Sequence, residues 1–143
     1  MRKLILASHG SMAEGLRSAA AMILGDVSDM TAYGLDTWIT PQSILDEIRV
    51  QMEKVPNAEY IILCDIKGGS VHNCLLELFN QFNLHIFTGM NLSLVLELSI
   101  LGDEGAMEQE AAMLLENAKN NLCYYNRQVL KKIKEEEGED NLW

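Results

Sequence analysis

The tripeptide Ser-His-Gly at residues 8–10 places an imidazole between two predicted elements. The apolar residues 4–7 are typical of a short strand, and Ser11 with Glu14 forms a capping box that predicts a helix start. His9 therefore lies at a strand-to-helix turn, next to helix N–H groups that favour an anion. An imidazole in such a turn can accept a group and pass it on, and a phosphoryl group is one such anion.

A second segment with chemical potential follows the apolar residues 60–63. Asp65 ends this predicted strand, Gly68 and Gly69 allow a sharp turn that presents N–H groups to an anion, and Ser70 is predicted to cap the next helix. The spacing is not that of a P-loop, so neither a bound nucleotide nor another cofactor is expected. We interpret the segment as a phosphate cradle.

The ends of parallel strands bring these segments together. In an open α/β sheet, ligands bind at the carboxyl ends of the strands, where the strand order reverses. If the first and third strands are neighbours, His9 faces Asp65. A carboxylate on one ring nitrogen fixes the tautomer and leaves the other nitrogen as a nucleophile, which is a phosphohistidine arrangement. A third strand end contributes Asn91, predicted to cap a helix.

The other two histidines fit other chemistry less well. His72 and His85 lack a partner at metal-ligand spacing, and no G-x-S-x-G elbow is present, so neither a metal site nor a serine hydrolase is expected. His72 is predicted to face solvent near the site. His85 begins a predicted strand at the opposite end of the sheet from His9 and is expected to be structural.

The composition defines the class of protein. A chain of 143 residues suits one domain, and no apolar run is long enough to cross a bilayer. Three cysteines without CxxC spacing argue against a disulfide framework and favour the reducing cytoplasm. The net charge of −10 makes nucleic acid an improbable partner and a basic protein surface a plausible one.

The order of elements predicts an α/β fold: one doubly wound, mostly parallel sheet in order 2-1-3-4 with helices on both faces. The domain is expected to span residues 1–130, followed by a charged tail over 131–143 that begins as a frayed helix end. Residues 122–125 are predicted to form a further strand at an edge of the sheet. The predicted strands are 3–8, 30–35, 59–65 and 84–88, and the predicted helices are 13–24, 41–55, 71–82, 92–101 and 107–119.

Taken together, these segments resemble the IIA component of the mannose-type sugar phosphotransferase system over nearly the whole chain. The resemblance rests on residues 5–10, on the helix over 13–25, on the loop from Asp65 to Asn73, and on residues 88–91. It implies that His9 accepts a phosphoryl group from the phosphohistidine of the carrier protein HPr and passes it to a IIB partner, in the service of the membrane components IIC and IID.

The resemblance also implies roles for the residues around His9. Asp65 would orient the ring, while Ser70 and the backbone of Gly68 and Gly69, together with Gly10, would hold the phosphoryl oxygens. The rim would include Lys67, Asn73 and Asn91. The family forms homodimers that exchange an edge strand, which agrees with the predicted strand at 122–125.

The chain departs from the family pattern at two positions and leaves two other interpretations open. Lys67 stands where an aromatic residue is usual, and Val71 where a proline is common. No linker or fused IIB domain follows, so a separate IIB polypeptide is expected. The alternatives are a phosphotransfer subunit of dihydroxyacetone kinase and a regulatory module whose phosphorylation is read by a partner without onward transfer. The identity of the sugar does not follow from the sequence.

Overall fold

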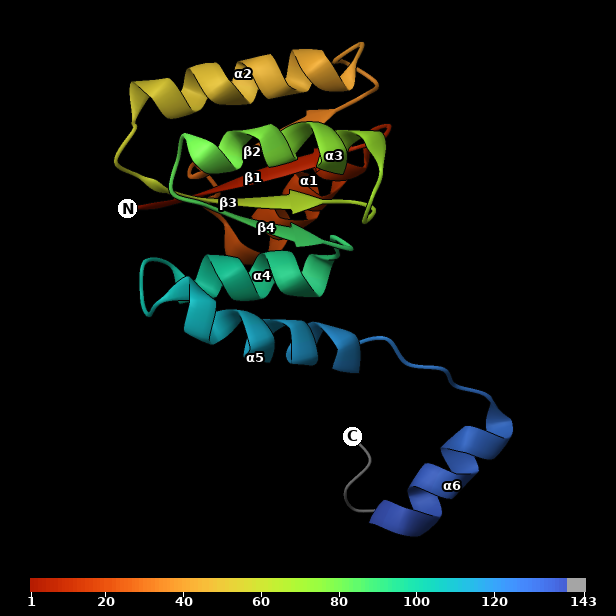
Figure 1. Cartoon of the computed structure of the whole chain (residues 1–143). Helices are drawn as coiled ribbons and strands as arrows, with labels where there is room; N and C mark the ends of the chain where they lie inside the picture. Colours follow the sequence, from red (N-terminus) through yellow and green to blue (C-terminus); the bar gives the residue numbers. More distant parts are fainter. Residues whose placement is uncertain (139–143) are drawn as a thin grey trace.

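The computed structural model describes residues 1–138. One parallel sheet forms the centre of the protein. Strands β1 (Arg2–Ser8), β2 (Met30–Gly34), β3 (Glu59–Cys64) and β4 (Leu84–Thr88) lie in the order β2-β1-β3-β4 (Figure 1). This confirms the predicted order and places each strand within one residue of its expected bounds. The helices are α1 (Met12–Leu24), α2 (Pro41–Lys54), α3 (Ser70–Leu75), the 3-10 helix η1 (Leu76–Asn80), α4 (Leu92–Leu101), α5 (Met107–Asn120) and α6 (Arg127–Glu137).

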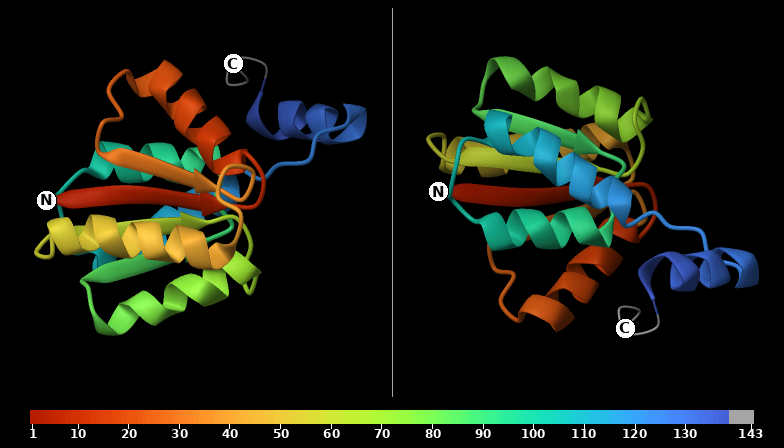
Figure 2. Two further views of the ribbon diagram at one scale, coloured as in Figure 1. Left: turned by 90° about the horizontal axis from the view of Figure 1, so that it is seen from above. Right: turned by 90° about the horizontal axis from the view of Figure 1, so that it is seen from below.

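Helices cover both faces of the sheet, as expected for a doubly wound fold. Helices α2 and α3 with η1 pack on one face, and α1, α4 and α5 pack on the other (Figure 2). Within residues 1–138, no helix combines the length and the apolar character needed to cross a bilayer.

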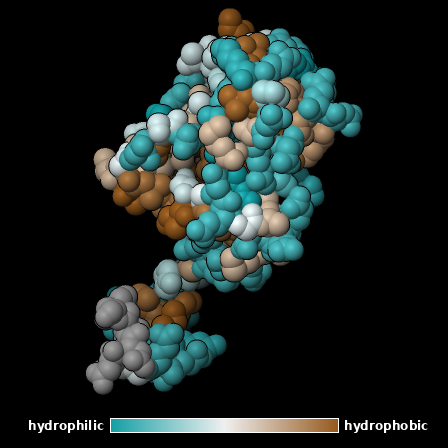
Figure 3. Space-filling model, turned by 90° about the vertical axis from the view of Figure 1, so that its left-hand side faces the viewer, coloured by the Kyte–Doolittle hydropathy of each residue, from teal (hydrophilic) through white to brown (hydrophobic). Residues whose placement is uncertain are grey.

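Arg2 closes the end of the sheet where the strands begin. Its side chain is only 3% exposed and pairs with Glu59, with 2.8 Å between Nε and Oε2. Its guanidinium also donates to the carbonyl oxygens of Gly102, Glu104 and Gly105, in the turn between α4 and α5. The second carboxylate oxygen of Glu59 lies 3.0 Å from Nε2 of His85. His85 is therefore at the end of the sheet away from His9, as predicted, and the surface at this end is largely hydrophilic (Figure 3).

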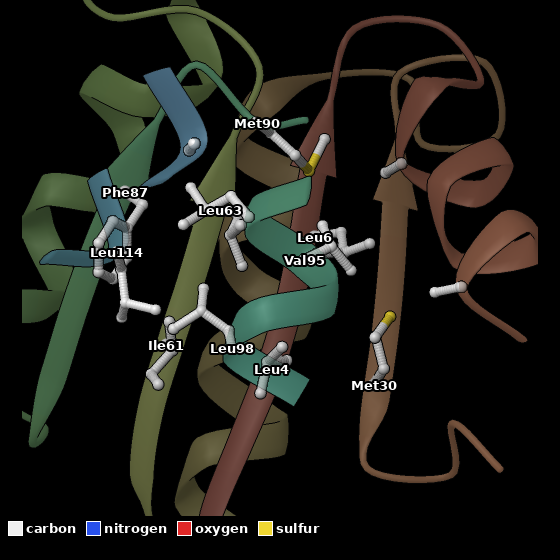
Figure 4. Packing of buried hydrophobic residues seen from close by; sticks show 14 of the residues in the cluster. Leu4, Leu6, Met30, Ile61, Leu63, Phe87, Met90, Val95, Leu98 and Leu114 are labelled. Carbon is white, nitrogen blue, oxygen red and sulfur yellow. The ribbon is translucent and has the colours of Figure 1, made fainter. Parts of the chain in front are cut away.

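The strands supply two apolar cores because successive side chains point to opposite faces of a sheet. In β1, Leu4 and Leu6 point to the face covered by α1, α4 and α5, whereas Ile5 and Ala7 point to the face covered by α2 and α3. Figure 4 shows the first of these cores, in which Leu63 and Phe87 lie close to α4 and α5. Burial on both faces explains the nearly continuous apolar runs in the sequence.

The predicted helix over 71–82 forms as two pieces. α3 ends at Leu75, and the chain continues as the 3-10 helix η1. Leu75 and Leu78 are both buried and are three residues apart. A 3-10 helix aligns side chains at this spacing, so the tighter winding points both leucines to the same core.

The C-terminal part of the chain departs most from the prediction. Residues 122–126 are exposed and form no strand with the rest of the described chain, and α6 then extends away from the sheet (Figures 1 and 2). The Asn126 side chain caps α6 by accepting from Val129 N at 2.8 Å. The predicted boundary at residue 130 falls inside α6, and residues 139–143 of the predicted tail lie outside the described residues.

The start of α1 is capped by a residue other than the one predicted. Ser11 occupies the N-cap position, but its side chain makes no capping hydrogen bond, so the expected capping box with Glu14 is wrong. Instead, Ser8 Oγ accepts from Ala13 N at 2.8 Å, and Ser8 is completely buried. The last residue of β1 therefore caps the first turn of α1, and this hydrogen bond closes the turn that carries His9. The predicted cap at Asn91 is confirmed, and Thr40 caps α2 by accepting from Ser43 N.

We expect Ser8→Ala to lower the free energy of unfolding by about 1 to 2 kcal/mol, because it leaves the Ala13 N–H without its acceptor in a buried place. The matched control is Ser11→Ala, which removes no capping bond and should change stability by less than about 0.5 kcal/mol. Urea denaturation followed by circular dichroism measures both. A larger loss for Ser11→Ala than for Ser8→Ala would contradict the capping assignment.

Candidate functional site

His9 and Asp65 meet at the carboxyl ends of β1 and β3, which are adjacent in the sheet. One carboxylate oxygen, Oδ2, accepts from the His9 backbone N–H at 2.7 Å and from ring Nδ1 at 2.8 Å. The other oxygen, Oδ1, accepts from the backbone N–H of Ile66 at 2.9 Å. His9 therefore faces Asp65, as predicted. The carboxylate fixes both the backbone and the ring of the histidine.

The surroundings keep the Asp65 carboxyl group ionised. Its side chain is 6% exposed, and burial alone raises the pKa of a carboxyl group. The hydrogen bonds from the backbone and ring of His9, the charge of the imidazole and the N–H of Ile66 oppose burial and lower the pKa of Asp65 below its usual value. The His9 side chain is 48% exposed, so the same pair presents a buried anion and an accessible ring.

The loop after Asp65 returns over the other side of the imidazole. Ser70 Oγ lies 3.4 Å from Nε2 of His9, and a Cβ added at Gly69 would lie 3.4 Å from Cε1 of the ring. Ser70 was expected to cap the following helix, but Gly69 occupies the N-cap position and Ser70 is the first residue of α3. Its hydroxyl is directed to the histidine instead.

Both backbone groups of Gly68 are held by side chains of α3. The Gly68 N–H donates to Nδ1 of His72 at 2.9 Å, and Asn73 Nδ2 donates to the Gly68 carbonyl oxygen at 3.1 Å. Gly68 has a φ of +74°, a conformation that favours glycine. The Gly69 N–H donates to the Ile66 carbonyl oxygen at 3.3 Å. His72 was predicted to face solvent, but it is half-buried and accepts a hydrogen bond from the loop. The only hint of this contact in the sequence is that His72 follows Gly68 by four residues.

A close approach between two loops fixes the turn that carries His9. A Cβ added at Gly34, the last residue of β2, would lie 2.2 Å from the carbonyl oxygen of Gly10. The Leu35 N–H donates to the Ser8 carbonyl oxygen at 3.0 Å, which continues the contact between β1 and β2. Gly34 is therefore needed for the backbone to pass, a requirement that only the three-dimensional contact with Gly10 reveals.

The remaining predicted rim residues lie on separate turns. Lys67 is exposed on the loop between Asp65 and Ser70. Asn91 caps α4 by accepting from Leu94 N at 3.0 Å, and its amide donates to the Gly89 carbonyl oxygen at 3.0 Å, so its hydrogen bonds stay within its own turn.

Neither a cluster of metal-binding side chains nor an ionised thiol lies near His9 in the described part of the chain. Within residues 1–138, no group of three or more His, Cys, Asp or Glu side chains is arranged to hold a metal ion. Cys64 lies next to Asp65 in the chain, but burial and the Asp65 charge raise the pKa of its thiol to about 12. The thiol therefore stays protonated at neutral pH, when only a thiolate would be nucleophilic.

The arrangement makes His9 Nε2 the reactive atom. Because Nδ1 donates its hydrogen to Asp65, the lone pair of the neutral ring is on Nε2, which points to the open side and to the Ser70 hydroxyl. A positive charge that forms on the ring after Nε2 attacks an electrophile is stabilised by the adjacent carboxylate.

Several solved structures share this fold. A sugar phosphotransferase system (PTS) permease from Klebsiella pneumoniae aligns with a TM-score of 0.77 and 29% identity, covering 90% of this chain and 93% of that one. A PTS IIA protein associated with the fucose utilization operon of Streptococcus pneumoniae aligns with a TM-score of 0.73 and 27% identity, covering 90% and 96%. The mannose/sorbose-specific IIA subunit from Enterococcus faecalis aligns with a TM-score of 0.73 and 23% identity, covering 87% and 95%.

Comparison of sequences gives the family. No curated protein matches the chain at a significant level of similarity. The family model described as "PTS system fructose IIA component" matches residues 3–118, which include all of the sheet except Arg2, together with His9 and the loop from Asp65 to Asn73. The chain therefore belongs to this family and is a IIA component of a sugar phosphotransferase system.

Proposed function

We propose that His9 accepts a phosphoryl group from the phosphohistidine of HPr and passes it to a IIB protein. The observation that carries this proposal is the single carboxylate that holds both the backbone and Nδ1 of His9 while Nε2 stays accessible. This supplies a nucleophile of fixed orientation that a second protein can reach. The family of the chain supports HPr and IIB as its partners.

In the proposed transfer, the Nε2 lone pair of His9 attacks the phosphorus of the donor phosphohistidine. A nitrogen–phosphorus bond forms on His9 as the donor nitrogen–phosphorus bond breaks, and the bonding electrons stay with the donor imidazole. Asp65 stabilises the charge that develops on the His9 ring. Transfer to IIB follows the same steps with His9 as the leaving group.

Ser70 is the group best situated to contact the phosphoryl oxygens, since its hydroxyl lies 3.4 Å from Nε2. Gly68 and Gly69 N–H groups each make a hydrogen bond within the protein, so either bond must open before that N–H binds the phosphoryl group. Binding of the phosphoryl group by these glycines and Gly10, and rim roles for Lys67, Asn73 and Asn91, remain predictions. We place this exchange in the cytoplasm, where a IIB protein links it to the membrane components IIC and IID.

We also propose that the protein works as a homodimer. β4 is an edge strand, and an apolar groove runs beside it between η1 and α5. The exposed residues 122–126 continue from α5, and the amphipathic helix α6 lies away from the sheet (Figure 1). Pairing of residues 122–125 with β4 of a second copy, in antiparallel orientation, would cover the open edge of each sheet. The groove is lined in part by Phe79, Leu84, Ile86, Phe87, Met107, Ala111 and Leu115.

His9→Ala should abolish acid-labile labelling by phosphoenolpyruvate, enzyme I and HPr, because it removes the nucleophilic nitrogen. In the wild-type protein, phosphorus NMR should show phosphorylation at Nε2, since Nδ1 is bonded to Asp65. His85→Gln is the control and should still be labelled, because His85 lies at the opposite end of the sheet. Labelling that survives in His9→Ala would contradict the assignment of the carrier.

Phosphorylated protein mixed with purified IIB candidates should lose its label to IIB, because a carrier passes the group on. Label that stays on His9 with every IIB candidate encoded by the same genome would instead support the regulatory interpretation.

Asp65→Asn should slow phosphorylation on the order of a hundredfold while the fold is retained. The carboxylate accepts three N–H groups on two oxygens, whereas an amide has one acceptor oxygen and must turn its NH₂ group to at least one of these donors. Rapid-quench labelling measures the rate, and circular dichroism checks the fold. A wild-type rate would contradict the proposed role of Asp65.

The acid stability of Asp65→Asn tests whether the Asp65 carboxylate stabilises the folded protein in its ionised form. Because the folded protein lowers the pKa of Asp65, the ionised carboxylate stabilises it above the unfolded pKa of about 4, and this contribution is lost as the pH falls through the folded pKa. The difference in free energy of unfolding between wild type and Asp65→Asn should therefore be larger above about pH 5 than below about pH 4.

Tyr124→Pro should convert a dimer into a monomer of 16.0 kDa, because proline lacks the N–H that a paired strand donates and disfavours the extended pairing. Tyr124→Val is the control, since valine favours strands and should keep the dimer. Sedimentation velocity at micromolar concentration measures the mass. A monomeric wild-type protein would refute the exchange of residues 122–125.

A further inference from the structure

We propose that His72 is a positioning residue for phosphoryl transfer, which acts by holding the tip of the loop that covers His9. This inference rests on the proposed function of His9. The observation is that His72 Nδ1 accepts the Gly68 N–H at 2.9 Å while the neighbouring Asn73 donates to the Gly68 carbonyl oxygen at 3.1 Å. One peptide unit on each side of Gly68 is thereby tied to the first turn of α3.

The loop held in this way carries the groups that surround the imidazole. Asp65 stands at its beginning and Ser70 at its end, and both contact the His9 ring. Gly68 lies between them with a left-handed backbone. The distance of 3.4 Å between Ser70 Oγ and Nε2 is near the upper limit of a hydrogen bond, so a small movement of the loop would separate them. Without the bond to His72, the backbone between Asp65 and Ser70 loses a constraint at its most flexible residue.

The same bond defines the tautomer of His72 and separates its role from that of His9. An imidazole that accepts on Nδ1 carries its hydrogen on Nε2 and has no other lone pair in the ring plane. The neutral His72 ring therefore has its nucleophilic nitrogen occupied by the Gly68 N–H. His9 has the opposite tautomer, with Nδ1 as the donor and Nε2 open. The two histidines beside this loop therefore have different roles: His9 receives the phosphoryl group, and His72 holds the loop.

The experiment compares two substitutions that each keep a different feature of histidine. In His72→Asn the side-chain oxygen takes the place of Nδ1 and can accept from Gly68, whereas in His72→Phe the ring is kept and the acceptor is lost. We expect His72→Phe to lower the maximal rate of His9 phosphorylation roughly tenfold, the effect of losing about one hydrogen bond, at an unchanged half-saturating concentration of phosphorylated HPr. His72→Asn should stay within about twofold of wild type.

A second readout measures the loop without any phosphoryl transfer. Hydrogen exchange of the Gly68 amide should be slow in wild type and His72→Asn and faster in His72→Phe, and nitrogen NMR of the His72 ring should show Nδ1 without hydrogen. An unchanged or increased rate of labelling in His72→Phe would overturn the proposal, as would an unchanged exchange rate at Gly68. If the wild-type protein is not labelled at all, the function proposed for His9 fails, and with it the role of His72 in transfer; the Gly68 exchange rates would still show whether His72 holds the loop.

Discussion

A single carboxylate connects the two halves of the site, and the geometry around it depends on that connection. Asp65 and His9 are 56 residues apart in the chain, yet they meet because β1 and β3 are parallel neighbours with Ala7 opposite Cys64. The carboxylate accepts the backbone and the ring of His9 with one oxygen and its own loop with the other. The orientation of the imidazole, the position of the loop and the negative charge beside Nδ1 therefore come from one group, which is itself nearly buried.

Much of the fold could be predicted because the physical signals were local and repeated. Short apolar runs, each followed by turn residues and a helical segment, indicate strands buried on both faces and joined by helices. Once the strands are parallel, their carboxyl ends lie at one edge, and His9 and Asp65 meet there because β1 and β3 are neighbours. Caps such as Thr40 and Asn91 were predictable because one side chain within three residues of its partner is enough.

The details that were missed depend on backbone angles that residue types leave open. Ser8 and Ser11 are both near the first turn of α1, and the bend at His9 decides which hydroxyl reaches the free N–H. His72 could face solvent or return to Gly68, and the left-handed backbone of Gly68 decides in favour of the return. Residues 122–125 have the composition of a strand, but a strand also needs a neighbour, and none within the described chain lies beside them. Their partner is a question of assembly rather than of local sequence.

Arg2 gives the two ends of the sheet different tolerances to change. Its guanidinium joins β1, Glu59 of β3 and the turn between α4 and α5, all at the end opposite His9. This set of bonds is thus remote from the surface around His9. A substitution at an exposed loop position such as Lys67 leaves the bonds of Arg2 intact, so the surface beside His9 can change its charge or shape without loosening the opposite end of the sheet.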